Sequence, residues 1–189
     1  MQFPTKYKCL SQNEYHKEDF KIIPIRYEDR INIMKWRNEQ MYHLRQEKPL
    51  TEKYQEDYFN GTVAGLFDHK KPNQILFSYL KNDKCIGYGG LVHINWKDKN
   101  AEISFIINTD LEENHFHFHW STYLKMIESL AFEELSFHKI YVYAFDLRPN
   151  LYKVLLDSNY FCDAKLKEHC YFNKRYLDVI IHSKLNQIH

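Results

Sequence analysis

Residues 74–95 read QILFSYLKNDKCIGYGGLVHIN, and this stretch decides the fold. It holds two apolar runs, Gln74 to Leu80 and Cys85 to Asn95, separated by the turn-forming pair Asn82-Asp83. Such a pattern predicts two antiparallel strands joined by a short turn. A third apolar run, Ala101 to Asn108, follows after a short polar segment. We therefore predict an antiparallel meander of three strands near the centre of the chain.

The five glycines all lie between positions 61 and 90. Walker loops (GxxxxGKS/T) and Rossmann turns (GxGxxG) need glycines because only this residue lets backbone amides approach a phosphate so closely. Neither motif is present. The nearest match, Gly87-Tyr88-Gly89-Gly90, lies inside an apolar run, and Val92 stands where the last glycine would be. We interpret these glycines as a β-bulge and exclude both nucleotide-binding motifs.

Helices and strands are predicted on both sides of the meander. Upstream, the patterns indicate one strand and three helical pieces: Phe20 to Arg26, a helix from its cap Asp29 to Glu39, a short piece from Tyr42 to Gln46, and a helix capped by Thr51 that stops at Asn60-Gly61. Downstream, they indicate a connection, two helices and three strands: Leu111 to Trp120, the amphipathic helix from Tyr123 to Leu135, the strand His138 to Phe145, a helix begun by Pro149 and ended by Asn159, and the strands Ala164 to Phe172 and Tyr176 to Ser183. This order predicts a mixed α+β fold, one domain over residues 1–189 with its core at about 20–185.

The composition excludes several classes of protein. Among 189 residues, 26 Lys and Arg nearly balance 25 Asp and Glu, so the basic excess of a nucleic-acid binder is missing. No apolar stretch approaches the roughly 20 residues that cross a bilayer, and no apolar core follows the first lysines as in a signal peptide. The four cysteines form no CxxC pair. We expect a cytoplasmic protein without a nucleic-acid partner and without membrane insertion.

Five segments in this order resemble the GNAT superfamily of acetyl-CoA-dependent N-acetyltransferases. They are Trp36-Arg37-Asn38 with Pro49-Leu50-Thr51 and Tyr58-Phe59, then Cys85 to Leu91, then Ala101-Glu102-Ile103-Ser104, then Ala131 to Leu135 before His138-Lys139-Ile140, and last Arg175 to Val179. The resemblance covers about residues 20–185. It implies a mostly antiparallel twisted sheet flanked by helices on both faces, with acetyl-CoA as co-substrate. The most similar branch contains ribosomal-protein N-terminal acetyltransferases and amino-sugar-nucleotide acetyltransferases.

The chain departs from the family pattern at two places. The family's pyrophosphate loop carries glycines at the start of the long helix, whereas Leu111 to Trp120 has none and includes Glu112 and Glu113. Each acid would repel a phosphate by about 1 kcal/mol at short range, although a helix N-terminus still offers amides. The position of the family's catalytic tyrosine falls on Leu155. Tyr152, three residues earlier on nearly the same face, could replace it.

The resemblance implies two catalytic residues and three substrate-binding residues. Glu102 would act as the base, or be a cross-strand charge, and Tyr152 would protonate the leaving thiolate, or only pack. Arg37 suits the phosphates of a sugar nucleotide. His93 lies on the neighbouring strand, either in the site or facing solvent. Asp146 either contacts substrate or caps the helix that follows.

The resemblance also implies a set of cofactor-binding residues. Backbone groups of Ile106, Ile107 and Asn108 would contact the pantetheine arm. His117 and His119 would offer backbone amides, with protonated imidazoles offsetting the two acids, and Asn150 completes the set. The histidines belong to an HxHxH run that could bind zinc on a strand, but at a helix start residues two apart diverge by about 200°. We therefore predict no metal site.

The resulting hypothesis is an N-acetyltransferase that moves an acetyl group from acetyl-CoA to the primary amine of a small molecule. An amino-sugar nucleotide is the favoured acceptor, with direct attack in a ternary complex. Two alternatives stay open: a protein or peptide N-acetyltransferase, and a GNAT-fold binding protein that lacks catalysis because its loop has no glycine. A homodimer is compatible with the sequence.

Overall fold

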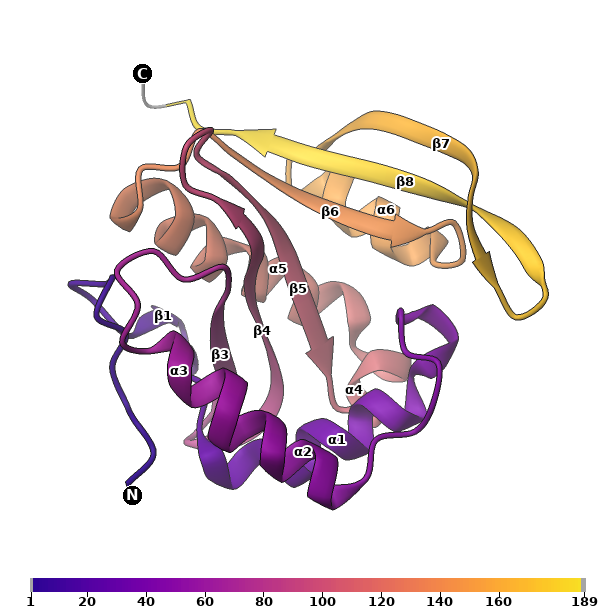
Figure 1. The fold of residues 1–189 in the computed structure, drawn as a ribbon. Coiled ribbons are helices and arrows are strands. Elements are labelled where there is room, and N and C mark those ends of the chain that lie inside the picture. Colours follow the sequence, from indigo (N-terminus) through magenta and orange to yellow (C-terminus); the bar gives the residue numbers. More distant parts are fainter. Residues whose placement is uncertain (1, 188–189) are drawn as a thin grey trace.

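One twisted sheet of eight strands runs through residues 2–187, the part of the chain that this computed structural model describes (Figure 1). The strand order is β1-β2-β3-β4-β5-β6-β8-β7, and every neighbouring pair is antiparallel except β5 with β6, which is parallel. The strands are β1 (Tyr15–Lys17), β2 (Phe20–Pro24), β3 (Ile75–Lys81), β4 (Lys84–Asn95), β5 (Asn100–Ile107), β6 (Lys139–Phe145), β7 (Phe161–Phe172) and β8 (Arg175–Leu185).

Helices cover both faces of this sheet. In Figure 1, α1, α2 and α3 lie in front of the strands, and α5 and α6 lie behind them. The helices are α1 (Arg30–Glu39), α2 (Glu52–Tyr58), α3 (Ala64–Leu66), α4 (Thr109–Asn114), α5 (Phe116–Glu128) and α6 (Pro149–Asp157), with 3-10 turns at Tyr27–Asp29 and Met41–His43 and π-helical turns at Phe59–Val63 and Ser129–Glu134. The predicted α+β class with a mostly antiparallel sheet is confirmed.

The predicted meander is β3, β4 and β5. The turn residues Asn82 and Asp83 have φ angles of 47° and 62°, the left-handed conformation that the favoured two-residue hairpin turn requires. The predicted bulge lies beside the first glycine of the apolar run: Tyr79 pairs with Gly87 and Leu80 pairs with Cys85, which leaves one residue of β4 outside the ladder. A second irregularity interrupts the pairing of β4 with β5 after Val92.

The parallel pair β5–β6 is short, and this shapes the site. Only Asn100–Glu102 and Lys139–Tyr141 pair, whereas β6 pairs with β8 over its whole length. Beyond Glu102, β5 pairs with β4 alone. The two strands therefore diverge, and each keeps an unpaired backbone edge that faces the other (Figure 1).

The amphipathic stripe of α5 packs on the sheet as predicted. Tyr123, Leu124 and Ile127 are fully buried. The ring of Tyr123 stacks on Phe105 of β5 with a centroid distance of 3.8 Å, so α5 is held flat against the strand that borders the opening.

Three expectations about the helices were wrong. Asp29 does not cap α1: its carboxylate accepts hydrogen bonds from Arg26 and Ser78 instead. The helix after Thr51 does not stop at Gly61 but continues through a π-helical turn, because burial of Phe59 and neighbouring apolar residues outweighs the cost of about 1 kcal/mol for a helical glycine. The connection 111–120 is helical, since Asn108 caps α4 by accepting from the amide of residue 110.

Other terminal signals were correct. The hydroxyl of Thr51 accepts a hydrogen bond from the amide of Tyr54, so it caps α2. Pro149 begins α6, and Asn159 has a φ of 61° just beyond its end. Among residues 2–187, no helix combines the length and apolar character needed to cross a bilayer.

Candidate active site

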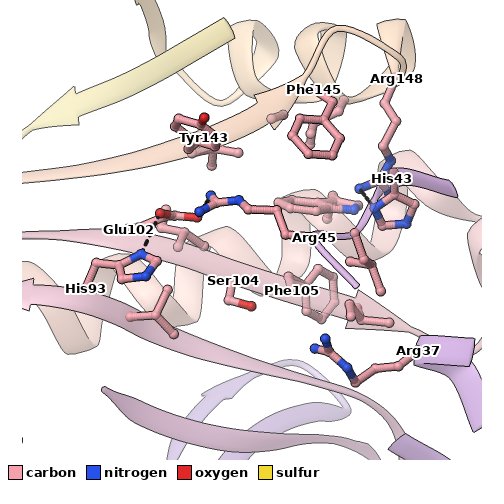
Figure 2. A pocket seen from close by; sticks show the side chains of 18 residues that line it. Arg37, His43, Arg45, His93, Glu102, Ser104, Phe105, Tyr143, Phe145 and Arg148 are labelled. Carbon is pink, nitrogen blue, oxygen red and sulfur yellow. Dashed lines mark hydrogen bonds and ion pairs between the residues drawn. The ribbon is translucent and has the colours of Figure 1, made fainter. Parts of the chain in front are cut away.

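A cavity of about 350 Å³ opens where β5 and β6 diverge (Figure 2). We call it the strand cavity. Its walls come from both strands, from α5, from the loop before α6, and from residues 37–45 at the end of α1 and beyond. It extends from Glu102 and His93, near the point where the strands still pair, to Arg148 at the open end.

Glu102 and His93 are brought together by the irregularity in β4. His93 adopts a φ of 49° at the register shift, a conformation that turns it out of the regular strand alternation. Its Nδ1 lies 2.8 Å from Oε2 of Glu102, and Arg45 donates to Oε1 of the same carboxylate at 3.1 Å. The side chain of Glu102 is 12% exposed, whereas those of His93 and Arg45 are 62% and 49% exposed. A shielded carboxylate thus contacts an imidazole that reaches solvent, which is the arrangement of a proton relay.

Arg45 joins the two sides of the strand cavity. Its guanidinium carbon lies 4.1 Å from the ring centroid of Tyr143 on β6 while it holds Glu102 on β5 (Figure 2). A cation over an aromatic face is stabilised by the ring quadrupole. Arg45 therefore fixes the orientation of the carboxylate.

Arg37 lies between the strand cavity and a second one of about 280 Å³, which α1, α2 and β4 surround. We call the second one the helix cavity. The guanidinium of Arg37 donates to the hydroxyl of Tyr88 at 2.7 Å and to Oε1 of Gln46 at 3.0 Å. Val92 and Ser104 also line both cavities, so the two meet at these residues.

The open end of the strand cavity holds a second buried charge pair. Arg148 forms an ion pair with Glu112 and lies 3.4 Å from Nδ1 of His43. The same guanidinium lies 5.0 Å and 5.8 Å from the ring centroids of Phe116 and Trp120. Burial and the nearby Arg148 lower the pKa of His43 to about 3, so its imidazole is neutral at pH 7. Burial raises the pKa of Glu112 against the opposing effect of Arg148.

Comparison with known protein families decides the identity. A family model described as "Acetyltransferase (GNAT) domain" matches residues 22–181. This chain belongs to the GNAT acetyltransferase family. It is an acyltransferase with acetyl-CoA as its co-substrate, as the resemblance implied. Comparison with curated proteins gave no match.

Solved structures similar to this GNAT enzyme include spermidine N-acetyltransferase from Vibrio cholerae in complex with CoA and spermine, at 20% identity and a TM-score of 0.78, covering 90% of this chain and 97% of that one. A dodecameric structure of the Vibrio cholerae enzyme in an intermediate state has 20% identity and a TM-score of 0.74, with 90% and 95% covered. At this identity the likeness shows the fold. It does not support the ribosomal-protein or amino-sugar branch in particular.

The strand cavity fits the co-substrate of the family. From Ile103 onward the outer backbone edge of β5 is unpaired, so an extended arm with amide groups can add to it as a strand would. When bound there, acetyl-CoA supplies an activated thioester. Of the three predicted contact residues on this strand, Ile106 lines the cavity. Ile107 and Asn108 do not line it: the Ile107 carbonyl accepts from Gln40, and the Asn108 amide donates to the carbonyl of residue 86.

Tyr152, Asp146 and Asn150 do not line the strand cavity. The hydroxyl of Tyr152 donates to the Phe145 carbonyl at 3.2 Å and to Asp146 at 3.1 Å, and burial together with Asp146 raises its pKa. The carboxylate of Asp146 also pairs with Lys165 and does not cap α6. Asn150 is exposed in the first turn of α6. Tyr152 thus lies outside the walls of the strand cavity, with its hydroxyl bonded to residues at the end of β6.

Two of the HxHxH histidines, His117 and His119, contact different parts of the molecule. His117 lies 2.8 Å from Asp157 of α6 on the exposed side of α5. His119 is buried and lies 3.0 Å from the hydroxyl of Tyr79; burial lowers its pKa to about 4. Its imidazole is therefore neutral at pH 7 and does not offset the acids, contrary to the prediction. Among the described residues no three His, Cys, Asp or Glu side chains gather as they would around a metal ion.

The residues that line the strand cavity without having been predicted include His43, Arg45, Tyr143 and Arg148. The sequence contained one signal for the last, since residues 146–148 follow a strand end at which such sheets open to ligands. The prediction at this strand end is Asp146, whereas the residue that lines the cavity is Arg148. Nothing in the spacing of His43 and Arg45 indicates that a short 3-10 segment carries them across to β5 and β6.

Proposed function

We propose that this enzyme acetylates the primary amine of an anionic small molecule, an amino-sugar nucleotide, by direct attack in a ternary complex. The observation that carries the acceptor class is the balance of charges around the site. Arg37 borders both cavities and an adjoining rim formed by residues 45–51 and Tyr54, to which Arg45 and Lys48 contribute two more cations. Among described residues, Glu102 is the carboxylate that lines the strand cavity, Glu47 lines the rim, and no carboxylate lines the helix cavity. Glu112, at the open end of the strand cavity, is paired with Arg148 and does not offset Arg37 or Lys48.

This charge balance favours an anion over a polyamine. Guanidinium groups bind phosphate oxygens with paired, charge-assisted hydrogen bonds. The helix cavity adds the rings of Tyr54, Tyr58 and Tyr88, whose flat apolar faces suit a sugar or a base. A polycation such as spermidine would instead need several carboxylates. The amine of the acceptor would pass from the helix cavity to the strand cavity beside Ser104, where the two cavities meet.

Glu102 serves as the base in this proposal. An ordinary aliphatic amine has a pKa of about 10.4 and is mostly protonated at neutral pH, so its attack requires loss of a proton. Glu102 accepts that proton directly or through a water molecule, and His93, hydrogen-bonded to it and open to solvent, passes it on. Arg45 holds the carboxylate in place.

Backbone groups complete the chemistry. Amides on the unpaired edge of β5 are available to the negative charge that develops on the acetyl oxygen. The leaving thiolate has a pKa of about 8.5 and needs little protonation to depart. A site in which no tyrosine donates to the thiolate is therefore chemically sufficient.

The test compares acceptors directly. The purified protein is incubated with acetyl-CoA and, in parallel, a uridine-diphosphate amino sugar, spermidine, or a peptide with a free N-terminus, and products are measured by mass spectrometry. We expect acetylation of the nucleotide sugar. Turnover of spermidine or of the peptide alone would overturn the acceptor class.

Lys48→Glu tests the role of charge at the rim. Reversal of an exposed cation next to the acceptor should raise KM for an anionic acceptor by about tenfold while KM for a neutral amine stays within about twofold. Lys53→Glu is the matched control, since Lys53 is exposed on α2 and lines none of the described cavities. Equal effects of the two variants would contradict the proposal.

A further inference from the structure

We propose that Arg148 binds a phosphate group of the donor. When no donor is present, Glu112 forms the ion pair with the Arg148 guanidinium that the phosphate would otherwise form. This inference rests on acetyl-CoA as the donor but not on the identity of the acceptor. It assigns a residue for phosphate binding in a chain in which the segment at the place of the family's pyrophosphate loop, Leu111 to Trp120, has no glycine.

The position of Arg148 supports the assignment. It lies at the start of α6 and lines the strand cavity at the end opposite Glu102 (Figure 2). The four residue-to-residue steps of β5 from Glu102 to Ile106 span about 13 Å at the usual rise of a strand. An arm laid along this edge would therefore have its reactive end near Glu102 and its other end near Arg148.

The ion pair of Arg148 with Glu112 is nearly dry. The two side chains are 10% and 9% exposed. Oε1 of Glu112 accepts from the guanidinium, but Oε2 is buried and has no hydrogen-bond partner. A buried carboxylate with one unsatisfied oxygen is a poor partner for the Arg148 guanidinium, and burial raises the pKa of this carboxyl group. A phosphate, with more oxygens and access to the open cavity, is a better one.

His43 holds the guanidinium toward the cavity. Because Arg148 can only donate, Nδ1 of His43 is the acceptor of their 3.4 Å contact, and the ring proton is on Nε2. Nε2 lies 3.3 Å from Oε1 of Gln40, whose amide donates to the carbonyl of Ile107 at 2.7 Å. This chain of hydrogen bonds ties Arg148 to the end of β5. A second ligand thus remains on the guanidinium when Glu112 leaves it.

The guanidinium of Arg148 also supplies a positive charge where α4 stands in place of the family's glycine-containing pyrophosphate loop. Asn108 caps α4, and its carbonyl accepts from the amides of Leu111 and Glu112. These amides are therefore engaged within the turn. A side-chain cation on the neighbouring loop can offset the phosphate charge at this end of the cavity.

The test measures binding of two ligands by calorimetry: CoA, and pantetheine, which has the same arm without phosphates. Arg148→Gln should weaken CoA binding by about 10- to 100-fold, the range for a charge-assisted hydrogen bond, and leave pantetheine within about twofold. Glu112→Gln should strengthen CoA binding by about three- to tenfold because the competing charge is gone.

Folding is controlled by a double variant. Arg148→Gln alone leaves the buried Glu112 without its partner, so Arg148→Gln with Glu112→Gln keeps a neutral pair of the same size. The double variant should bind CoA as weakly as the single one. Arg175→Gln, an exposed arginine on β8, is the matched control and should bind as the unaltered protein does.

The inference would be overturned by unchanged CoA affinity in both Arg148 variants, or by an equal loss of affinity for CoA and pantetheine. Absence of any CoA binding by the unaltered protein would overturn it as well. If instead CoA binds through Arg148 while the nucleotide sugar is not acetylated, the acceptor proposal fails and the assignment of Arg148 stands.

Discussion

Replacing Glu102 by Gln separates a catalytic base from a structural charge. The amide has nearly the same shape and keeps an oxygen for the 3.1 Å hydrogen bond from Arg45. It removes the negative charge and the acceptor strength that a base needs. His93 and Arg45, the partners left behind, are 62% and 49% exposed, so water can solvate both.

The expected magnitudes differ for stability and for catalysis. Ion pairs with exposed partners contribute about 0–1 kcal/mol, so the variant should unfold within about 2–4 °C of the unaltered protein. Loss of a general base typically lowers the rate by about 100-fold or more. A 100-fold loss of kcat/KM corresponds to about 2.7 kcal/mol of transition-state stabilisation, well above the change in stability.

The assay is a pH–rate profile of kcat/KM for Glu102→Gln and the unaltered enzyme. The deficit should be largest at low pH, where the amine is protonated, and should shrink as pH approaches the pKa of the amine. Glu128→Gln is the matched control: Glu128 pairs with Lys184 at 2.8 Å, is 19% exposed, and lies outside the described cavities. A deficit that does not change with pH, or one matched by a large fall in melting temperature, would refute the assignment.

Two further predictions concern stability. Gly89→Ala should lower the free energy of unfolding by about 3 kcal/mol or more in urea titration, because the added Cβ would lie 2.1 Å from the Ser104 carbonyl. Gly65→Ala is the control and should be neutral, because the space around Gly65 is open. Similar free energies for the two variants would contradict the close packing at Gly89. Folding lowers the pKa of His119 to about 4, so as pH falls the unfolded chain takes up a proton on this residue at a higher pH than the folded protein does. The free energy of unfolding should therefore fall by about 2 kcal/mol as pH is lowered from about 7 to about 5. His119→Asn should remove this contribution to the slope of the free energy of unfolding against pH. An unchanged slope in that variant would be evidence against the role of His119.

The strands and the proximity of Glu102 to His93 were the most predictable features. Glu102 and His93 lie on neighbouring strands of a hairpin-connected meander, so local pairing brings them together. Alternation along β4 alone would have misplaced His93, because the register shift turns it. For Tyr152, helical spacing predicts the face of α6 that it occupies, but the contact of its hydroxyl with the Phe145 carbonyl at the end of β6 depends on how α6 packs.

The sequence by itself determined the architecture through the order of the apolar runs, the turn pair at 82–83, the cap at Thr51 and the helix start at Pro149. The turn and the helix starts act over only a few residues of backbone. The strand cavity and the residues that line it depend on the tertiary structure. β5 and β6 come from distant segments, and they pair only at their first residues, whereas β6 pairs with β8 along its whole length. Arg45 and Arg148 enter the cavity from loops whose direction no local pattern encodes. Short-range backbone preferences can be read along the chain, whereas the meeting of charged side chains is set by long-range packing.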